Sequence, residues 1–149
     1  MAAKDFYHEH VKTALQKDGW TITDEPLKGE WLGTKVYVDL GAERLIAAEK
    51  GLEKIAIEVK SFIGPSRIED LRDALGQFVI YRLCLKRDFP ERVLFLAVRD
   101  DVYPAIFEKT DGRILLQDQE LRIIVFNPVR KEIVKWISWT DTETSLRTS

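Results

Sequence analysis

Three charged residues near the ends of two strand-like segments have the chemical types needed to hold a metal ion against a phosphodiester. Asp39 ends an apolar segment that starts at residue 36, and Glu58 and Lys60 close the segment 55–60. Because side chains alternate along a strand, Glu58 and Lys60 share one face, opposite the apolar residues. The same alternation predicts Val38 and Leu40 on one face and Asp39 on the other. Two carboxylates and an ammonium group on neighbouring strand ends are the minimum equipment for Mg²⁺-dependent phosphodiester chemistry.

The Glu58–Lys60 pattern also has a plainer interpretation. On a solvated strand face these residues would form a surface ion pair of little energetic weight, and spacing alone favours this interpretation because the triplet is common. The rest of the segment is Ile, Ala, Ile and Val, which indicates a central, buried strand. Charges on such a strand are uncommon unless they have partners or a function, so the burial pattern favours a site.

Residues on two predicted helices could complete this site. Gln77 and Tyr81 lie one turn apart, beside the apolar stripe of the helix that follows the Glu58 strand, and could reach over the strand end. Glu9 on the first helix could supply a third carboxylate to a metal shell. The alternative for all three is an exposed helix surface. His8 and His10 point in different directions on a helix, which favours one partly buried and one surface residue over two metal ligands.

The elements that must position these residues follow from hydrophobic periodicity. A loop is expected over 24–34, where Pro26, Gly29 and Gly33 interrupt the chain, and an antiparallel meander of three strands follows it. The strongest helix is expected to begin at Ser66, which forms a capping box with Glu69. Helices are expected over 4–18, 66–86, 101–109 and 112–119, and strands over 20–23, 35–41, 43–50, 53–61, 92–98, 121–126 and 132–137.

The segment 53–98 reads as strand, long helix and buried strand, which predicts a right-handed crossover with parallel strand pairing. The 149 residues suit one domain over 1–140, with a polar tail over 141–149 that we expect to be disordered. No membrane span or secretory signal is visible, so a cytoplasmic location is expected. The single cysteine, Cys84, excludes an internal disulfide and lies in an apolar helical pattern, as a small core residue would.

These stretches resemble a known family. The order of Glu9 on a helix, Asp39 and Glu58-x-Lys60 on strands, and Gln77-x-x-x-Tyr81 on a helix resembles the PD-(D/E)xK superfamily of restriction-endonuclease-like nucleases. More narrowly, residues 4–137 look like XisH, a cyanobacterial family named for controlling excision of the fdxN DNA element. The narrower resemblance rests on the segments 4–8, 17–23, 38–43 and 57–62, and it covers nearly the whole chain.

The resemblance implies an α/β fold with a restriction-endonuclease-like, mixed β-sheet core flanked by helices. It implies that Asp39, Glu58 and Glu9 bind Mg²⁺ or Mn²⁺, that Lys60 is the catalytic lysine, and that Gln77 and Tyr81 line the site. Val38 stands where the superfamily motif has proline.

The resemblance also implies a function, the control of programmed DNA element excision beside a separate recombinase and a companion protein, XisI. One hypothesis is therefore a Mg²⁺-dependent endodeoxyribonuclease. The alternative is a non-catalytic regulatory module that binds the recombinase complex or an XisI-like partner, and the net charge of −2 favours it, because free-standing DNA binders are usually basic. A third hypothesis is a structural dimerisation protein. A symmetric homodimer could place two sites on the two strands of a duplex.

Overall fold

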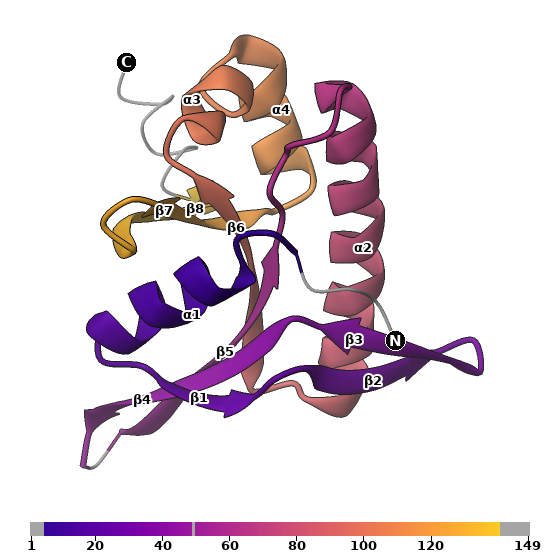
Figure 1. Cartoon of the computed structure of the whole chain (residues 1–149). Helices are drawn as coiled ribbons and strands as arrows, with labels where there is room; N and C mark the ends of the chain where they lie inside the picture. Colours follow the sequence, from indigo (N-terminus) through magenta and orange to yellow (C-terminus); the bar gives the residue numbers. More distant parts are fainter. Residues whose placement is uncertain (1–4, 49, 141–149) are drawn as a thin grey trace.

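The expected mixed sheet flanked by helices is confirmed by the computed structural model, which describes residues 5–48 and 50–140. Six strands form one sheet in the order β1-β4-β5-β6-β7-β8, and β2 and β3 form a second, two-stranded sheet (Figure 1). The helices are α1 (His8–Lys17), α2 (Arg67–Asp88), α3 (Val102–Ile106) and α4 (Thr110–Asp118). The strands are β1 (Thr21–Asp24), β2 (Leu27–Trp31), β3 (Thr34–Val38), β4 (Leu40–Ala47), β5 (Gly51–Val59), β6 (Arg92–Arg99), β7 (Arg122–Asn127) and β8 (Glu132–Ser138). The tail 141–149 lies outside the described residues.

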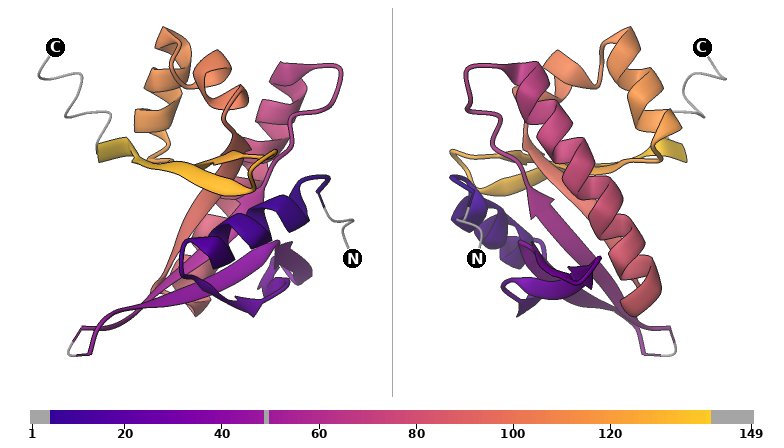
Figure 2. Two further views of the ribbon diagram at one scale, coloured as in Figure 1. Left: turned by 60° about the vertical axis from the view of Figure 1, so that its left-hand side comes forward. Right: turned by 90° about the vertical axis from the view of Figure 1, so that its right-hand side faces the viewer.

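Helices cover both faces of the six-stranded sheet, with α1 on one side and α2, α3 and α4 on the other (Figures 1 and 2). Alternation along β5 explains this layering. Ile55 and Ile57 are buried in a cluster with Val11 of α1, whereas Ala56 is buried in a second cluster with Phe78 of α2. Glu58 is two residues beyond Ala56, so it lies on the α2 side of the sheet.

The expected crossover is confirmed: β5 and β6 pair in parallel, with Glu58 opposite Leu96, and α2 connects them. Ser66 caps α2 by accepting a hydrogen bond of 3.3 Å from the backbone N–H of Glu69. Phe78 of α2 is almost fully buried against the sheet. Truncation of such a side chain to alanine costs about 3–5 kcal/mol, so the packing of α2 is firmly fixed.

The prediction of a loop over 24–34 is wrong in its middle part, because residues 27–31 form β2. Gly29 suggested a loop, but a Cβ at this position would lie 2.7 Å from the Sγ atom of Cys84 on α2. Glycine therefore allows the strand to approach the helix, and the Cys84 thiol donates a hydrogen bond to the Glu30 carbonyl at 3.3 Å. Cys84 is buried, as expected.

The antiparallel meander is confirmed only in part. β4 and β5 pair antiparallel as expected, but β3 pairs with β2 and not with β4. The physical reason is a change of direction at Asp39, where the chain leaves one sheet and enters the other. The first helix also begins later than expected, at His8.

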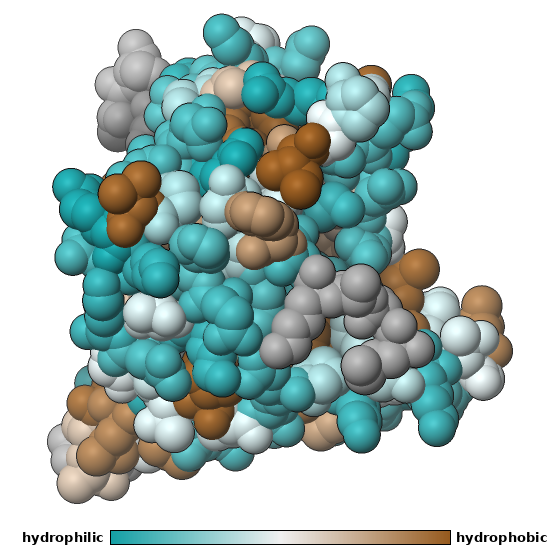
Figure 3. Space-filling model, viewed as in Figure 1, coloured by the Kyte–Doolittle hydropathy of each residue, from teal (hydrophilic) through white to brown (hydrophobic). Residues whose placement is uncertain are grey.

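Exposed apolar side chains gather at the tip of the β4–β5 hairpin, at the lower left of Figure 3. Leu45 and Leu52 are paired across the two strands, and Ile46 is exposed beside them. Within the described residues, no helix has both the length and the apolar character needed to cross a membrane.

Candidate active site

Asp39 occupies the short bend between β3 and β4. The β2–β3 pairing reaches Leu27 opposite Val38, and the β1–β4 pairing reaches Asp24 opposite Gly41. Val38 is buried in the α2 cluster, whereas Leu40 is buried in the α1 cluster, so the expectation that they share a face is wrong. The bend frees the Asp39 side chain from a strand face and places it at the junction of the two sheets.

Asp39 and Glu58 are held together by backbone hydrogen bonds across this junction. The Asp39 backbone N–H donates to Oε1 of Glu58 at 3.2 Å, and the Val59 backbone N–H donates to Oδ2 of Asp39 at 2.7 Å. Glu58 is only 5% exposed. The sequence therefore correctly predicted two neighbouring carboxyl groups on adjoining strand ends.

Burial and mutual repulsion make both carboxyl groups hard to ionise. Burial raises the pKa of Glu58 well above its usual value, and the nearby charge of Asp39 raises it further. Burial also raises the pKa of Asp39, and the two side chains share a hydrogen bond. Two carboxylates in one buried site cannot both ionise cheaply, so a bound cation would stabilise the doubly ionised pair.

Asp5 is a third carboxylate, near enough to act electrostatically on this pair, and the sequence did not predict it. It accepts hydrogen bonds from the backbone N–H groups of Tyr7 (3.1 Å) and Ser61 (3.0 Å). Burial raises the pKa of Asp5, and its two backbone hydrogen bonds and the charge of Lys60 offset part of this rise. The charge of Asp5 in turn raises the pKa of Glu58. An acidic residue just before a helix was the only local signal, because the contact with Ser61 spans 56 residues of sequence.

Lys60 follows β5 directly, and its backbone N–H donates to the Ala97 carbonyl at 3.1 Å, which continues the pairing with β6. Its positive charge lowers the pKa of Asp5, which opposes the rise that burial causes. Tyr81 of α2 is half-buried, and its pKa is raised by burial and by the charges of Glu58 and Asp39. The structure thus brings Asp39, Glu58 and Tyr81 close together, and Lys60 follows two residues after Glu58 at the end of β5.

Glu9 belongs to a separate group. Ligand atoms of His8, Glu9 and Glu25 lie within 4.8 Å of one another. Within the described residues, no other group of three or more His, Cys, Asp or Glu residues is as compact. His8 Nε2 lies 2.6 Å from Glu25 Oε2, and Lys12 Nζ donates to Glu25 Oε1 at 2.8 Å. The hydrogen bond from Lys12 lowers the pKa of Glu25 to about 2, although burial opposes it. A metal ion in this group would have to displace Lys12 from Glu25. Of the two histidines, His8 is buried and His10 is half-buried.

The Asp39–Glu58 pair has the donor set that a hard divalent cation prefers. Carboxylate oxygens are suitable ligands for Mg²⁺ and Mn²⁺, and Mg²⁺ usually keeps several waters when one or two carboxylates hold it. Two polar side-chain atoms of neighbouring chain segments are buried without a hydrogen-bond partner among the described residues: the Oγ atom of Ser61, next to Lys60, and the Oε1 atom of Gln77, one turn before Tyr81 on α2. Buried polar atoms normally have partners, so these two atoms are available to a ligand or its waters.

Comparisons with known proteins identify the family of the chain. A sequence model described as XisH protein matches residues 1–134. The chain belongs to the XisH family. The solved structure of an XisH family protein from Nostoc punctiforme matches it with 39% identity and a TM-score of 0.79, over 89% of this chain and 99% of that chain. An fdxN element excision controlling factor protein from Anabaena variabilis matches with 40% identity and a TM-score of 0.79, over 90% of this chain and 99% of that chain. No curated protein matches the chain.

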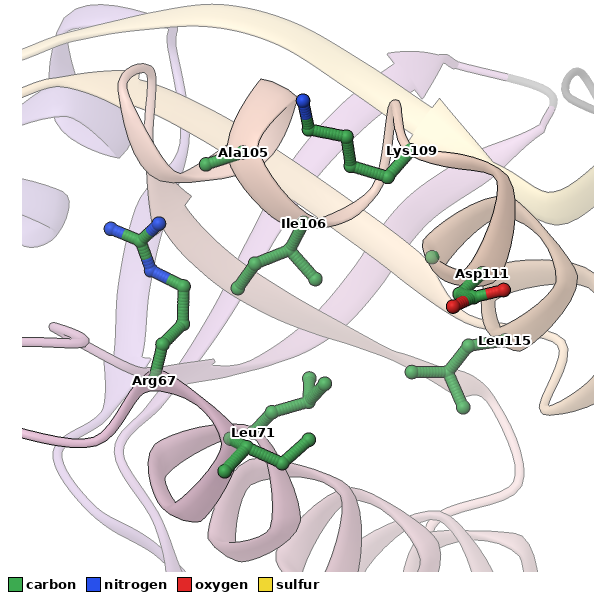
Figure 4. Close-up of a pocket in the computed structure, with 9 residues that line it drawn as sticks. Arg67, Leu71, Ala105, Ile106, Lys109, Asp111 and Leu115 are labelled. Atoms are coloured by element: carbon green, nitrogen blue, oxygen red, sulfur yellow. The ribbon is translucent and has the colours of Figure 1, made fainter.

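A recess of about 350 Å³ in this XisH family member lies away from the carboxylates, between the start of α2 and the α3–α4 pair. Leu71, Ile106 and Leu115 form much of its apolar wall, and Arg67 and Lys109 stand at its rim (Figure 4). It brings no carboxylate pair together, so its lining is not suited to metal-dependent chemistry.

Proposed function

We propose that this chain acts in the control of DNA element excision through Mg²⁺- or Mn²⁺-dependent cleavage of a phosphodiester bond at Asp39, Glu58 and Lys60. The observation that carries the proposal is the pair formed by buried Glu58 and partly buried Asp39, hydrogen-bonded across the junction of two sheets, with Lys60 two residues further along the same chain segment as Glu58. Such a pair costs folding free energy unless a ligand uses it.

The sheet supports membership of the restriction-endonuclease-like PD-(D/E)xK superfamily. β5 is central, antiparallel to β4 and parallel to β6, with helices on both faces. Asp39 lies in the bend before β4, and Glu58 and Lys60 lie at the end of β5, an arrangement that supports the resemblance to the superfamily pattern. The solved relative from Anabaena variabilis, described as an excision controlling factor, supports the biological setting.

In the proposed reaction, Asp39 and Glu58 hold the divalent ion, and Asp5 adds negative charge beside them. The bound ion would supply Lewis-acid polarisation and a more acidic water. The Lys60 ammonium group stabilises the charge that develops on the phosphate oxygens when water attacks phosphorus and the bond to the leaving oxygen breaks. Gln77 and Tyr81 position water or phosphate through their side-chain oxygens. Glu9 contributes to the site only if its side chain moves away from the group that it forms with His8 and Glu25.

The second candidate function is a non-catalytic regulatory module that binds a recombinase complex or an XisI-like companion. The slightly acidic net charge of −2 favours it, because a protein that holds DNA by phosphate neutralisation is usually basic. Both functions fit a cytoplasmic protein that works beside other excision proteins, and a homodimer could present two sites to one duplex. In the nuclease function, DNA is the substrate. In the regulatory function, DNA is bound by the partner proteins.

A cleavage assay separates the two functions. Supercoiled, linear and branched DNA would be incubated with Mg²⁺ or Mn²⁺ and the wild type, Glu58→Ala or Glu53→Ala. Glu53 is the matched control because it lies on the same strand but is half exposed and paired with Arg44 at 3.2 Å. We expect cleavage by the wild type and by Glu53→Ala, and none by Glu58→Ala.

Failure of the wild type on every substrate, with and without an XisI-like protein, would favour the regulatory module. Cleavage that survives in Glu58→Ala would contradict the proposed site. Circular dichroism of each variant would show whether it is folded, so that a loss of activity reports on chemistry.

A further inference from the structure

A second recess, of about 160 Å³, is lined by basic residues and lies beside the last turns of α2. Arg82 and Lys86 stand one turn apart on α2, Arg122 begins β7, and Arg92 begins β6. Apolar side chains and Pro90 complete the lining, which contains no acidic residue. Four cationic residues in one small recess are unexpected in a chain whose net charge is −2.

Three of these cations have no carboxylate partner among the described residues. Arg82 donates to the Gln119 carbonyl at 2.5 Å, which fixes its guanidinium group but leaves its charge uncompensated. Arg82, Lys86 and Arg122 form no ion pair with any carboxylate within residues 5–48 and 50–140. Arg92 differs, because it donates to the Ile55 carbonyl at 2.9 Å and lies 3.1 Å from Asp24.

General helix energetics do not explain this grouping. Lys86 alone is favourable near the C-terminal end of α2, where the helix dipole attracts positive charge. Arg82 and Lys86 are like charges four residues apart, an arrangement that destabilises a helix slightly, and Arg122 adds a third like charge from another element. A bound anion would reverse this repulsion.

The basic recess is separate from the carboxylate site. Tyr81, on the carboxylate side of α2, packs beside Leu27 and Val38 of the two-stranded sheet, whereas Arg82 contacts the end of α4. In the right-hand view of Figure 2, α2 runs between the β2–β3 sheet and α4. A phosphate in the recess is therefore not the phosphate that Glu58 and Asp39 would process.

We propose that Arg82, Lys86 and Arg122 form a binding site for a phosphate group. Planar guanidinium groups recognise phosphate oxygens in pairs, and a neighbouring lysine adds a point charge. Whole small-molecule pockets usually measure about 300–1,000 Å³, so a recess of about 160 Å³ suits one compact anionic group. Its source is either the backbone of a nucleic acid or free phosphate.

The test uses the full chain in EDTA, so that metal binding at the carboxylates cannot contribute. Binding of inorganic phosphate would be measured by calorimetry, and binding of a fluorescein-labelled DNA duplex by anisotropy over a range of salt concentrations. The variant Arg82→Gln/Lys86→Gln/Arg122→Gln removes the three recess charges. The matched control Lys50→Gln/Lys109→Gln/Lys131→Gln removes the same net charge at exposed lysines outside the recess.

We expect the recess variant to bind phosphate at least about tenfold more weakly than the wild type and the control variant to stay within about twofold. A parallel loss of duplex affinity, with a salt slope reduced by about one, identifies the nucleic acid backbone as the source. An unchanged duplex affinity identifies free phosphate. Arg122→Gln, which breaks no hydrogen bond of the described residues, should show the same direction of effect if the triple variant is unstable.

Equal effects of the two triple variants on both ligands, or no binding of either ligand by the wild type, would overturn the proposal. Because metal is absent, neither result depends on the proposed nuclease activity.

Discussion

The two sides of α2 carry opposite charge at very different cost. On one side, Glu58 is buried and Asp39 is partly buried, the two side chains share a hydrogen bond, and desolvation raises the pKa of each. On the other side, Arg82 and Lys86 line an open recess where water can solvate them. Charges in water are inexpensive to keep, whereas buried carboxylates are not, so the acidic side is the one that requires a ligand to be stable when ionised.

This difference also separates the roles we assign to the two sides. The carboxylate side holds Asp39 and Glu58 together by hydrogen bonds, and the charge of Lys60 acts on the nearby Asp5. The basic side offers guanidinium and ammonium groups, and the lining of its recess contains no carboxylate. Changes on the first side should therefore alter chemistry, and changes on the second should alter affinity.

The largest expected difference between the two sides is in the rate of cleavage. Lys60→Ala should lower kcat by about 10²–10³, because it removes the charge that stabilises the transition state. Lys86→Ala on the other side of α2 should leave kcat unchanged, and it should raise KM where the recess binds the nucleic acid backbone. Steady-state cleavage kinetics measure both constants, and Lys54→Ala, on the same strand as Glu58, is the control. A kcat loss of equal size in Lys60→Ala and Lys86→Ala would remove the distinction.

A smaller effect is expected on the pH dependence of stability without metal. The pKa of Glu58 is raised in the folded state, so its contribution to stability is present below its ordinary value of 4.5 and is lost as the pH rises through the folded value. The Tm in EDTA should fall as the pH rises from 5 to 8, on the order of 2–4 °C for each kcal/mol lost.

The matched pair Glu58→Gln and Glu53→Gln tests this origin. Glu58→Gln should flatten the decline of Tm with pH, and Glu53→Gln should leave it unchanged, in thermal melts at each pH. Asp5 and Asp39 also have raised pKa values and should leave a residual slope. A decline of the same size in both variants would show that Glu58 does not carry the effect.

The smallest effect is expected at Glu25, whose electrostatics run the opposite way. Its pKa is lowered from 4.5 to about 2, chiefly by the hydrogen bond from Lys12, so its stabilisation is present above pH 4.5 and disappears as the pH falls to 2. Glu25→Gln should lower the free energy of unfolding by about 0.5–1 kcal/mol at pH 7, because the Lys12 pair is partly exposed. Urea unfolding should show no difference between wild type and variant near pH 2.

The parts of the fold that depend on local pattern could be predicted from the sequence. The spacing of apolar residues in α2 and the continuous apolar run of β6 follow directly from burial on one or both faces. β2 could not be predicted, because Gly29 is explained only by the position of Cys84, which lies 55 residues later. The bend at Asp39 was also missed, since alternation continues through Val38 and Leu40 in the sequence but not in space.

The same limit applies to the sites. Asp39, Glu58 and Lys60 could be proposed because two adjoining segments present them at strand ends. Asp5 joins them only through the docking of the N-terminal segment on Ser61. Arg122 and Arg82 line one recess only because the fold brings the start of β7 near the last turns of α2, and neither residue carries a local sign of this placement.

The metal site at Asp39 and Glu58 is tested most directly by a titration with Mn²⁺ that is monitored by calorimetry and by electron paramagnetic resonance. The wild type, Asp39→Asn/Glu58→Gln and Glu9→Gln/Glu25→Gln would be compared, because the last variant removes the carboxylates of the separate group around His8. We predict that the wild type and Glu9→Gln/Glu25→Gln bind Mn²⁺ at millimolar concentration or below, and that Asp39→Asn/Glu58→Gln binds at least about tenfold more weakly. No binding by the wild type, or a loss confined to Glu9→Gln/Glu25→Gln, would contradict a metal site at Asp39 and Glu58.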